Sequence, residues 1–151
     1  MNIKKLISIL IFVSLTSCGF QPIYSLKNKI SYEIKEIELI GDKNINRKIV
    51  NIAGLKKSEG NEDLYELTLD SQKVINVMSK NKKSNVSIYR TIISVEVSLK
   101  NENKVIKTKR FSNSFTYNNN SNKFELSEYQ KNIEKNLTDK IAEEIIIFLN
   151  Y

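Results

Sequence analysis

The clearest hydrophobic pattern in the chain lies over residues 87–100, where apolar and polar side chains alternate. From Tyr89 to Leu99 the odd-numbered positions are apolar or β-branched, whereas the even-numbered positions include the charged residues Arg90 and Glu96. A period of two is typical of a strand with one face in a core and the other in water. The same reasoning predicts further strands over residues 31–40, 64–78 and 104–117.

The alternation changes phase within the first of these strands. Tyr32 and Ile34 share one face of an extended chain, and Ile37 and Leu39 share the other. One extra residue in one strand of a pair, a β-bulge, shifts side chains in this way. The pattern therefore indicates either a bulge near the middle of the strand or two halves that are used differently.

Two segments have the helical period instead. Residues 44–56 carry isoleucines at steps of three or four, with polar residues elsewhere on the helical wheel. Asp42 or Asn44 can cap the start of this helix, because a short polar side chain accepts hydrogen bonds from free N–H groups there. Gly54 lies close to its predicted end.

The second helix is longer and covers residues 125–150, where apolar residues again step by three or four. Ser127 and Gln130 have the spacing of a capping box near its start. Its last part, residues 145–149, is apolar on all sides. Two interpretations stay open for this end: it is fully buried in the core, or it is an exposed patch that docks on a partner.

The predicted order is strand, helix, three strands, helix. Three consecutive strands joined by short turns are typical of an antiparallel meander. A sheet with one wet face and two amphipathic helices predicts a two-layer α+β sandwich, with a four-stranded, mostly antiparallel sheet and both helices packed on one face. Residues 31–151 are expected to form this single domain.

The N-terminus has a different pattern. Lys4 and Lys5 precede an apolar run over residues 6–15 that only two serines interrupt. This run is too short to span a bilayer, which needs about 20 apolar residues. A positive start followed by a short apolar core is typical of an export signal. We therefore predict that residues 1–17 are a removable signal peptide.

The end of this signal resembles the lipobox of bacterial lipoproteins. Residues 15–18 read Leu-Thr-Ser-Cys, an apolar residue and two small residues before a cysteine. The resemblance implies that Cys18 becomes the lipidated N-terminus, and residues 18–30 would then be a tether. The alternative is an ordinary secretory signal with a chance cysteine. Cys18 is the only cysteine of the chain, and an unpaired thiol in an exported protein favours lipidation.

Charge narrows the possible partners. The formal net charge is +7, and it becomes +5 without residues 1–17, which hold two lysines and no acid. A basic surface suits phosphates, anionic lipid or nucleic acid, and export argues against nucleic acid. The chain is also rich in Lys, Asn and Ile, whose codons are AT-rich, so the charge can equally reflect genome composition.

The chain has few of the residues that commonly act in catalysis. The chain has no histidine, its one cysteine is assigned to a lipid, and it has no Gly-rich phosphate loop. No cluster of side chains has the spacing of metal ligands. We therefore expect a protein that is not an enzyme and that uses no metal and no cofactor.

The residues after the lipobox carry a further resemblance. Residues 18–24 read Cys-Gly-Phe-Gln-Pro-Ile-Tyr, which is similar to the start of the LptE family of lipopolysaccharide-assembly lipoproteins. The predicted order of elements resembles that family's fold as well. Membership would place the protein at the periplasmic face of the outer membrane, anchored by its lipid. It would assemble with and plug a β-barrel partner that inserts lipopolysaccharide into the outer leaflet, and it would bind lipopolysaccharide through basic residues.

Two basic clusters are candidates for that binding. Lysines suit phosphate groups as point charges, and arginine can bind them bidentately. For both clusters the alternative is a solvated turn or edge that resists aggregation. The first cluster is the turn between the second and third strands with one residue beyond it, and the second lies on the fourth strand: Lys80, Lys82, Lys83 and Arg90, then Lys107, Lys109 and Arg110.

A competing function stays open. The chain could be a free-standing periplasmic lipoprotein that binds anionic lipid or an envelope polymer. Such a protein would purify as a monomer, whereas a barrel subunit would co-purify with a large barrel.

Overall fold

The computed structural model describes most of the chain beyond the expected tether. The signal peptide 1–17, Cys18 and the tether up to residue 29 lie outside the described residues. What the structure describes is residue 30 and residues 32–58, 60, 64–102 and 104–151.

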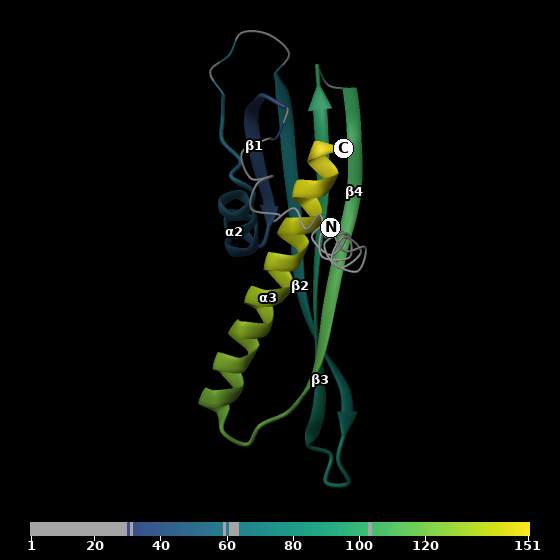
Figure 1. The fold of residues 1–151 in the computed structure, drawn as a ribbon. Helices are drawn as coiled ribbons and strands as arrows, with labels where there is room; N and C mark the ends of the chain where they lie inside the picture. The colour runs from purple at the N-terminus through teal and green to yellow at the C-terminus, as the bar shows by residue number, and fades with distance from the viewer. Residues whose placement is uncertain (1–29, 31, 59, 61–63, 103) are drawn as a thin grey trace, which may run out of the picture.

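The described part folds into one sheet with two helices on one of its faces (Figure 1). Strand β1 pairs with β2 in parallel, and the other two pairings are antiparallel. The predicted α+β class, the order of elements and the mostly antiparallel sheet are confirmed. The elements are β1 (Ile34–Gly41), α2 (Lys43–Ala53), β2 (Tyr65–Lys80), β3 (Val86–Asn101), β4 (Lys104–Asn118) and α3 (Lys123–Asn150).

The phase change in the first strand is a β-bulge. The register of β1 against β2 shifts between Ile34, which pairs with Tyr65, and Glu36, which pairs with Glu66. Lys35 is therefore the extra residue, and the side chains on either side of it change faces. Of the two interpretations, the bulge is correct.

Helix α2 is shorter than predicted, because its end is fixed by a glycine. Asp42 caps the start, and its side chain accepts hydrogen bonds from the N–H groups of Asn44 and Ile45. Gly54 has the left-handed backbone angle φ 65°, and its N–H bonds the carbonyls of the last turn. Glycine adopts this angle without steric cost, so the helix stops there and not at residue 56.

The cap of helix α3 lies five residues before the serine of the suggested capping box. Asn122 is the cap, and its side chain accepts hydrogen bonds from the N–H groups of Phe124 and Glu125. The carboxylate of Glu125 accepts from the side-chain amide of Asn122 in return. The cap is therefore Asn122 and not Ser127, since asparagine caps as well as serine does, and the backbone N–H of Asn122 donates to the side chain of Asn120 and not to Glu125.

The core lies between the inner face of the sheet and the two helices. The apolar C-terminal end of α3 belongs to it, because Ile145, Ile146 and Leu149 are almost fully buried. Only Ile147 points outward, with 44% of its surface exposed. The interpretation of this end as core is therefore correct for three sides of the helix. None of the helices in the described part of the chain is long and apolar enough to cross a membrane.

One polar residue inside this core is expected to matter for stability. The Asn46 side chain is fully buried, and its amide donates to the carbonyl oxygens of Ile40 (2.6 Å) and Leu69 (3.2 Å). Asn46→Ala leaves both carbonyls without this donor. We expect the free energy of unfolding to fall by about 2 kcal/mol. The measurement is urea unfolding, and Asn51→Ala on the exposed side of the same helix, expected to change stability by less than about 0.5 kcal/mol, is the control.

Candidate functional site: the distal arm

The sheet continues well beyond its first strand. β1 ends at Gly41, opposite Ser71, whereas β2 runs on to Lys80 before the chain turns back into β3. At about 3.3 Å per residue, this extension is about 30 Å long. We call residues 72–92 the distal arm; it projects at the lower end of the molecule in Figure 1. Within the described residues, its β2 edge has no strand paired to it.

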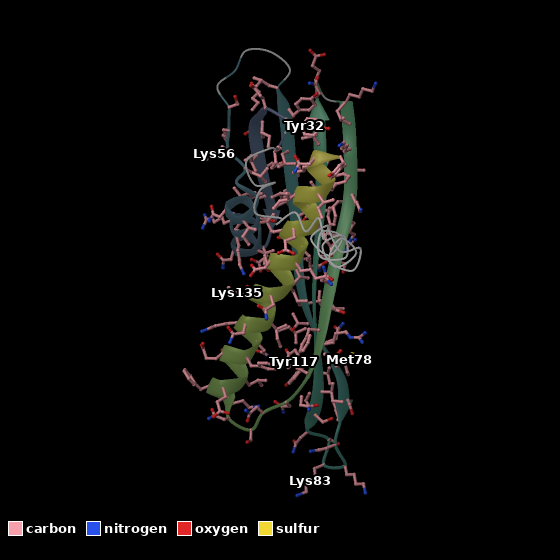
Figure 2. The ribbon with its side chains drawn as sticks, in the orientation of Figure 1. Tyr32, Lys56, Met78, Lys83, Tyr117 and Lys135 are labelled. Carbon is pink, nitrogen blue, oxygen red and sulfur yellow. The ribbon has the colours of Figure 1, made fainter. Side chains whose placement is uncertain are left out.

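The tip of the arm is a turn that one asparagine organises. The Asn81 side chain accepts hydrogen bonds from the N–H groups of Lys83 (2.9 Å) and Asn85 (3.0 Å). Ser84 adopts φ 61°, which is uncommon for a residue with a side chain. Lys82 and Lys83 are exposed on this turn, and Figure 2 shows Lys83 pointing away from the rest of the protein.

The structure brings three of the four predicted tip residues together. Lys80, Lys82 and Lys83 lie within four positions of one another at the end of the arm. Arg90 lies on the outer face opposite Asn76, about 13 Å from Lys80 along the strand. Its guanidinium donates to the Thr116 hydroxyl at 3.0 Å. Arg90 is therefore on the wet face as expected, but outside the lysine group.

The second basic cluster is divided between the two faces of β4. The Lys107 ammonium lies 5.2 Å from the ring centre of Tyr32 and 5.7 Å from that of Phe148. The Lys109 ammonium lies 5.1 Å from Phe111 and 5.8 Å from Phe148. These lysines cover the edge of an aromatic core, an interaction that is favourable in its own right.

Arg110 faces the other way. Its register partner is Glu96, which is itself opposite Asp70, so the arginine lies beside acidic residues on the outer face. A cation there offsets the repulsion between two carboxylates on neighbouring strands. Lys107, Lys109 and Arg110 therefore do not form one site.

Sequence analysis did not single out the apolar surface of the arm. Val77 and Met78 are each 49% exposed, and Val74 and Ile75 are exposed as well. These residues follow one another along β2, so both faces of the strand are apolar there. The signal was present in the sequence, as the run Val74 to Met78 with little polar interruption, but it predicted only that this segment is part of a strand.

The base of the arm is attached to α3 by an ion pair. The Lys73 ammonium lies 2.6 Å from a carboxylate oxygen of Glu134. The hydrogen bond that the Lys73 ammonium donates to Glu134 raises the pKa of Lys73 above its usual value. This contact holds the helix to the sheet just above the exposed apolar run.

A cleft lies beside the arm, between the start of α3 and the sheet, with a volume of about 640 Å³. The Tyr117 ring lies in its lining, and the Tyr117 hydroxyl is bonded to Thr91 (3.2 Å) and to the amide of Gln130 (2.9 Å). The lining comprises Ile88, Phe115, Thr116, Tyr117, Asn118, Asn119, Asn120, Ser121, Glu125, Leu126 and Tyr129. The cleft was not predicted from the sequence, since it depends on where α3 leaves the sheet.

The described residues contain no group of three or more acidic, histidine or cysteine side chains that could hold a metal ion.

The fold can be compared with known proteins. No protein-family model matches the chain, and no curated protein matches it either. Solved structures do match. Rare lipoprotein B from Shewanella oneidensis superimposes with a TM-score of 0.60 at 16% identity, over 76% of this chain and 92% of that one.

Two further structures agree. A minor lipoprotein from Acinetobacter baumannii gives a TM-score of 0.59 at 12% identity, over 79% of this chain and 92% of that one. A lipoprotein from Caulobacter crescentus gives 0.52 at 14% identity, over 85% and 96%. The chain therefore has a fold that several bacterial lipoproteins have.

Proposed function

We propose that this protein is an outer-membrane lipoprotein of the LptE type. In this proposal Cys18 carries the lipid anchor, and the domain assembles with and plugs a β-barrel that inserts lipopolysaccharide into the outer leaflet. The observation that carries the proposal is the distal arm: a strand edge without a partner in the described residues, apolar on both faces, with three lysines at its tip.

The arm has the properties of a surface that another protein covers. A strand edge presents free N–H and C=O groups, and natural proteins usually shield such edges with charges, bulges or proline. From Val74 to Val77 the β2 edge has no charge and no proline, and its register with β3 first shifts at Met78. A barrel interior, or a barrel strand before closure, would cover it. The resemblance of residues 18–24 to the LptE family supports the same assignment.

The lysine tip supports the second half of the proposal. Lipopolysaccharide carries phosphates at its lipid A end, and ammonium groups on an exposed turn can reach them without the cost of desolvating a buried charge. Lys80, Lys82 and Lys83 are not in any ion pair within the described part of the chain. They are therefore available to an anionic ligand.

The decisive experiment is an affinity pull-down of the lipidated protein from detergent-solubilised outer membrane. We expect a large β-barrel protein to be recovered with it. Val77→Asp should reduce that recovery at least tenfold, because a charge in a covered apolar edge is not solvated. Ile147→Asp, at a residue of similar exposure on α3, is the matched control and should leave recovery unchanged.

Recovery of no barrel would contradict the proposal, as would equal recovery with both variants. A protein that purifies alone and still binds an envelope lipid or polymer would instead be the free-standing binding module.

A further inference from the structure

The cleft beside the distal arm has the volume of a small-molecule site. Its volume of about 640 Å³ lies within the range of ordinary ligand pockets, roughly 300–1,000 Å³. Two of its aromatic residues remain open to solvent: Phe115 is 45% exposed and Tyr129 is 47% exposed. Tyr117 is held beneath them by its hydrogen bonds to Thr91 and Gln130, so the ring cannot turn freely.

The other wall of the cleft is polar and nearly uncharged. It consists of residues 118–121, three asparagines and a serine, together with Glu125. The carboxylate of Glu125 already accepts hydrogen bonds from the side-chain amides of Asn120 (2.8 Å) and Asn122 (3.0 Å). Amide and hydroxyl groups offer both donors and acceptors to a ligand.

This lining excludes two other ligand classes. A phosphate would meet one negative side chain and no positive one, since Glu125 is the only charged residue of the lining. An acyl chain would cover the polar wall without satisfying its hydrogen bonds, at a cost of about 1–3 kcal/mol per group. The Asn119 side-chain amide donates to the carbonyl of Val86 at 2.8 Å, which fixes this side chain in the wall of the cleft.

A neutral sugar ring can pack on the aromatic wall and form hydrogen bonds with the polar wall. Its C–H faces pack on aromatic rings, and its hydroxyl groups donate to and accept from amides and carboxylates. We propose that this cleft binds a neutral saccharide, with the ring against Tyr129 and Phe115 and the hydroxyl groups toward residues 118–121. The inference does not need the lysine tip to bind phosphate.

The test uses the full-length lipidated protein in detergent and isothermal titration calorimetry. One probe is the lipid-free core oligosaccharide of lipopolysaccharide, dephosphorylated and with its carboxyl groups reduced so that it is uncharged. The other is an uncharged oligomer of N-acetylglucosamine, which stands for the glycan of peptidoglycan. We expect one of them to bind, and the one that binds identifies the source of the saccharide.

Tyr129→Ala should weaken that binding at least tenfold, and Phe115→Ala should do the same. Tyr151→Ala, at an 88% exposed tyrosine at the other end of α3, is the matched control and should bind as the unchanged protein does. Circular dichroism establishes that each variant is folded. If neither saccharide binds, or if the cleft variants bind as well as the control, the proposal is wrong.

Saccharide binding can be tested independently of the proposed function. Replacing Lys80, Lys82 and Lys83 with serine removes the phosphate contacts but leaves the cleft unchanged, so saccharide affinity should not move. A protein that recovers its barrel but binds no sugar would keep the proposed function and lose this inference.

Discussion

Gly41→Ala is expected to lower the free energy of unfolding by about 3 kcal/mol. Gly41 is the last residue of β1 and has φ +78°, a backbone angle that side chains disfavour. A Cβ built there would lie 2.0 Å from the carbonyl oxygen of Ser71 and 3.0 Å from its carbon. Both atoms are backbone in a paired strand, and the same oxygen accepts from the N–H of Asp42 at 3.0 Å. The clash can be relieved only by breaking the end of the β1–β2 pairing.

Urea unfolding followed by circular dichroism measures this loss. Gly60→Ala is the matched control, because its Cβ would meet the carboxylate oxygen of Glu33 at 2.3 Å, the flexible end of a side chain. That variant should lose less than about 0.5 kcal/mol. Equal losses in the two variants would show that the close approach to Ser71 is not what makes glycine necessary.

Replacing Lys80, Lys82 and Lys83 together with serine is expected to weaken lipopolysaccharide binding by about 10- to 100-fold at physiological salt. Each ammonium that reaches a phosphate contributes about 0.5–1 kcal/mol in an exposed setting, and three such contacts give this range. Because the contacts are between exposed charges, the affinity of the unchanged protein should fall with added salt, and that of the variant should fall less.

The experiment titrates lipopolysaccharide against the lipidated protein at two salt concentrations. A second variant, with Lys43, Lys135 and Lys140 replaced by serine, removes the same charge from exposed positions on the two helices. That variant should bind within about threefold of the unchanged protein, since long-range attraction is screened beyond about 8 Å. Unchanged binding in the tip variant would refute the tip as the lipopolysaccharide site, and equal weakening in both variants would assign the effect to net charge.

The strands could be predicted closely because their signal is local. In β3 every second side chain enters the core, so the alternation over residues 87–100 marks the strand almost to its observed ends, Val86 and Asn101. The phase change before Ile37 likewise indicated a bulge as one of two interpretations, since a single extra residue exchanges the two faces. The ends of the helices were predicted less accurately, because Gly54 and Asn122 act through backbone geometry and not through periodicity.

The candidate site was predicted only in part, for a different reason. The alternation of side chains predicts that Ile75 and Val77 share a face of the strand. It does not predict whether another element covers that face. Coverage depends on the length of β1 and on the path of α3, which lie elsewhere in the sequence. β1 stops at Gly41 and α3 begins beside β4, so the outer part of β2 is left as an exposed apolar edge.

The sequence by itself determined the elements, their order, the class of fold and the lysines of the tip turn, because each of these follows from neighbours along the chain. Only the tertiary structure decided that β1 pairs in parallel, that Arg110 lies beside Glu96 and Asp70, and that a polar and aromatic cleft opens beside α3. These features arise from contacts between distant segments, where the position of one element sets the exposure of another. No local pattern of residues carries that information.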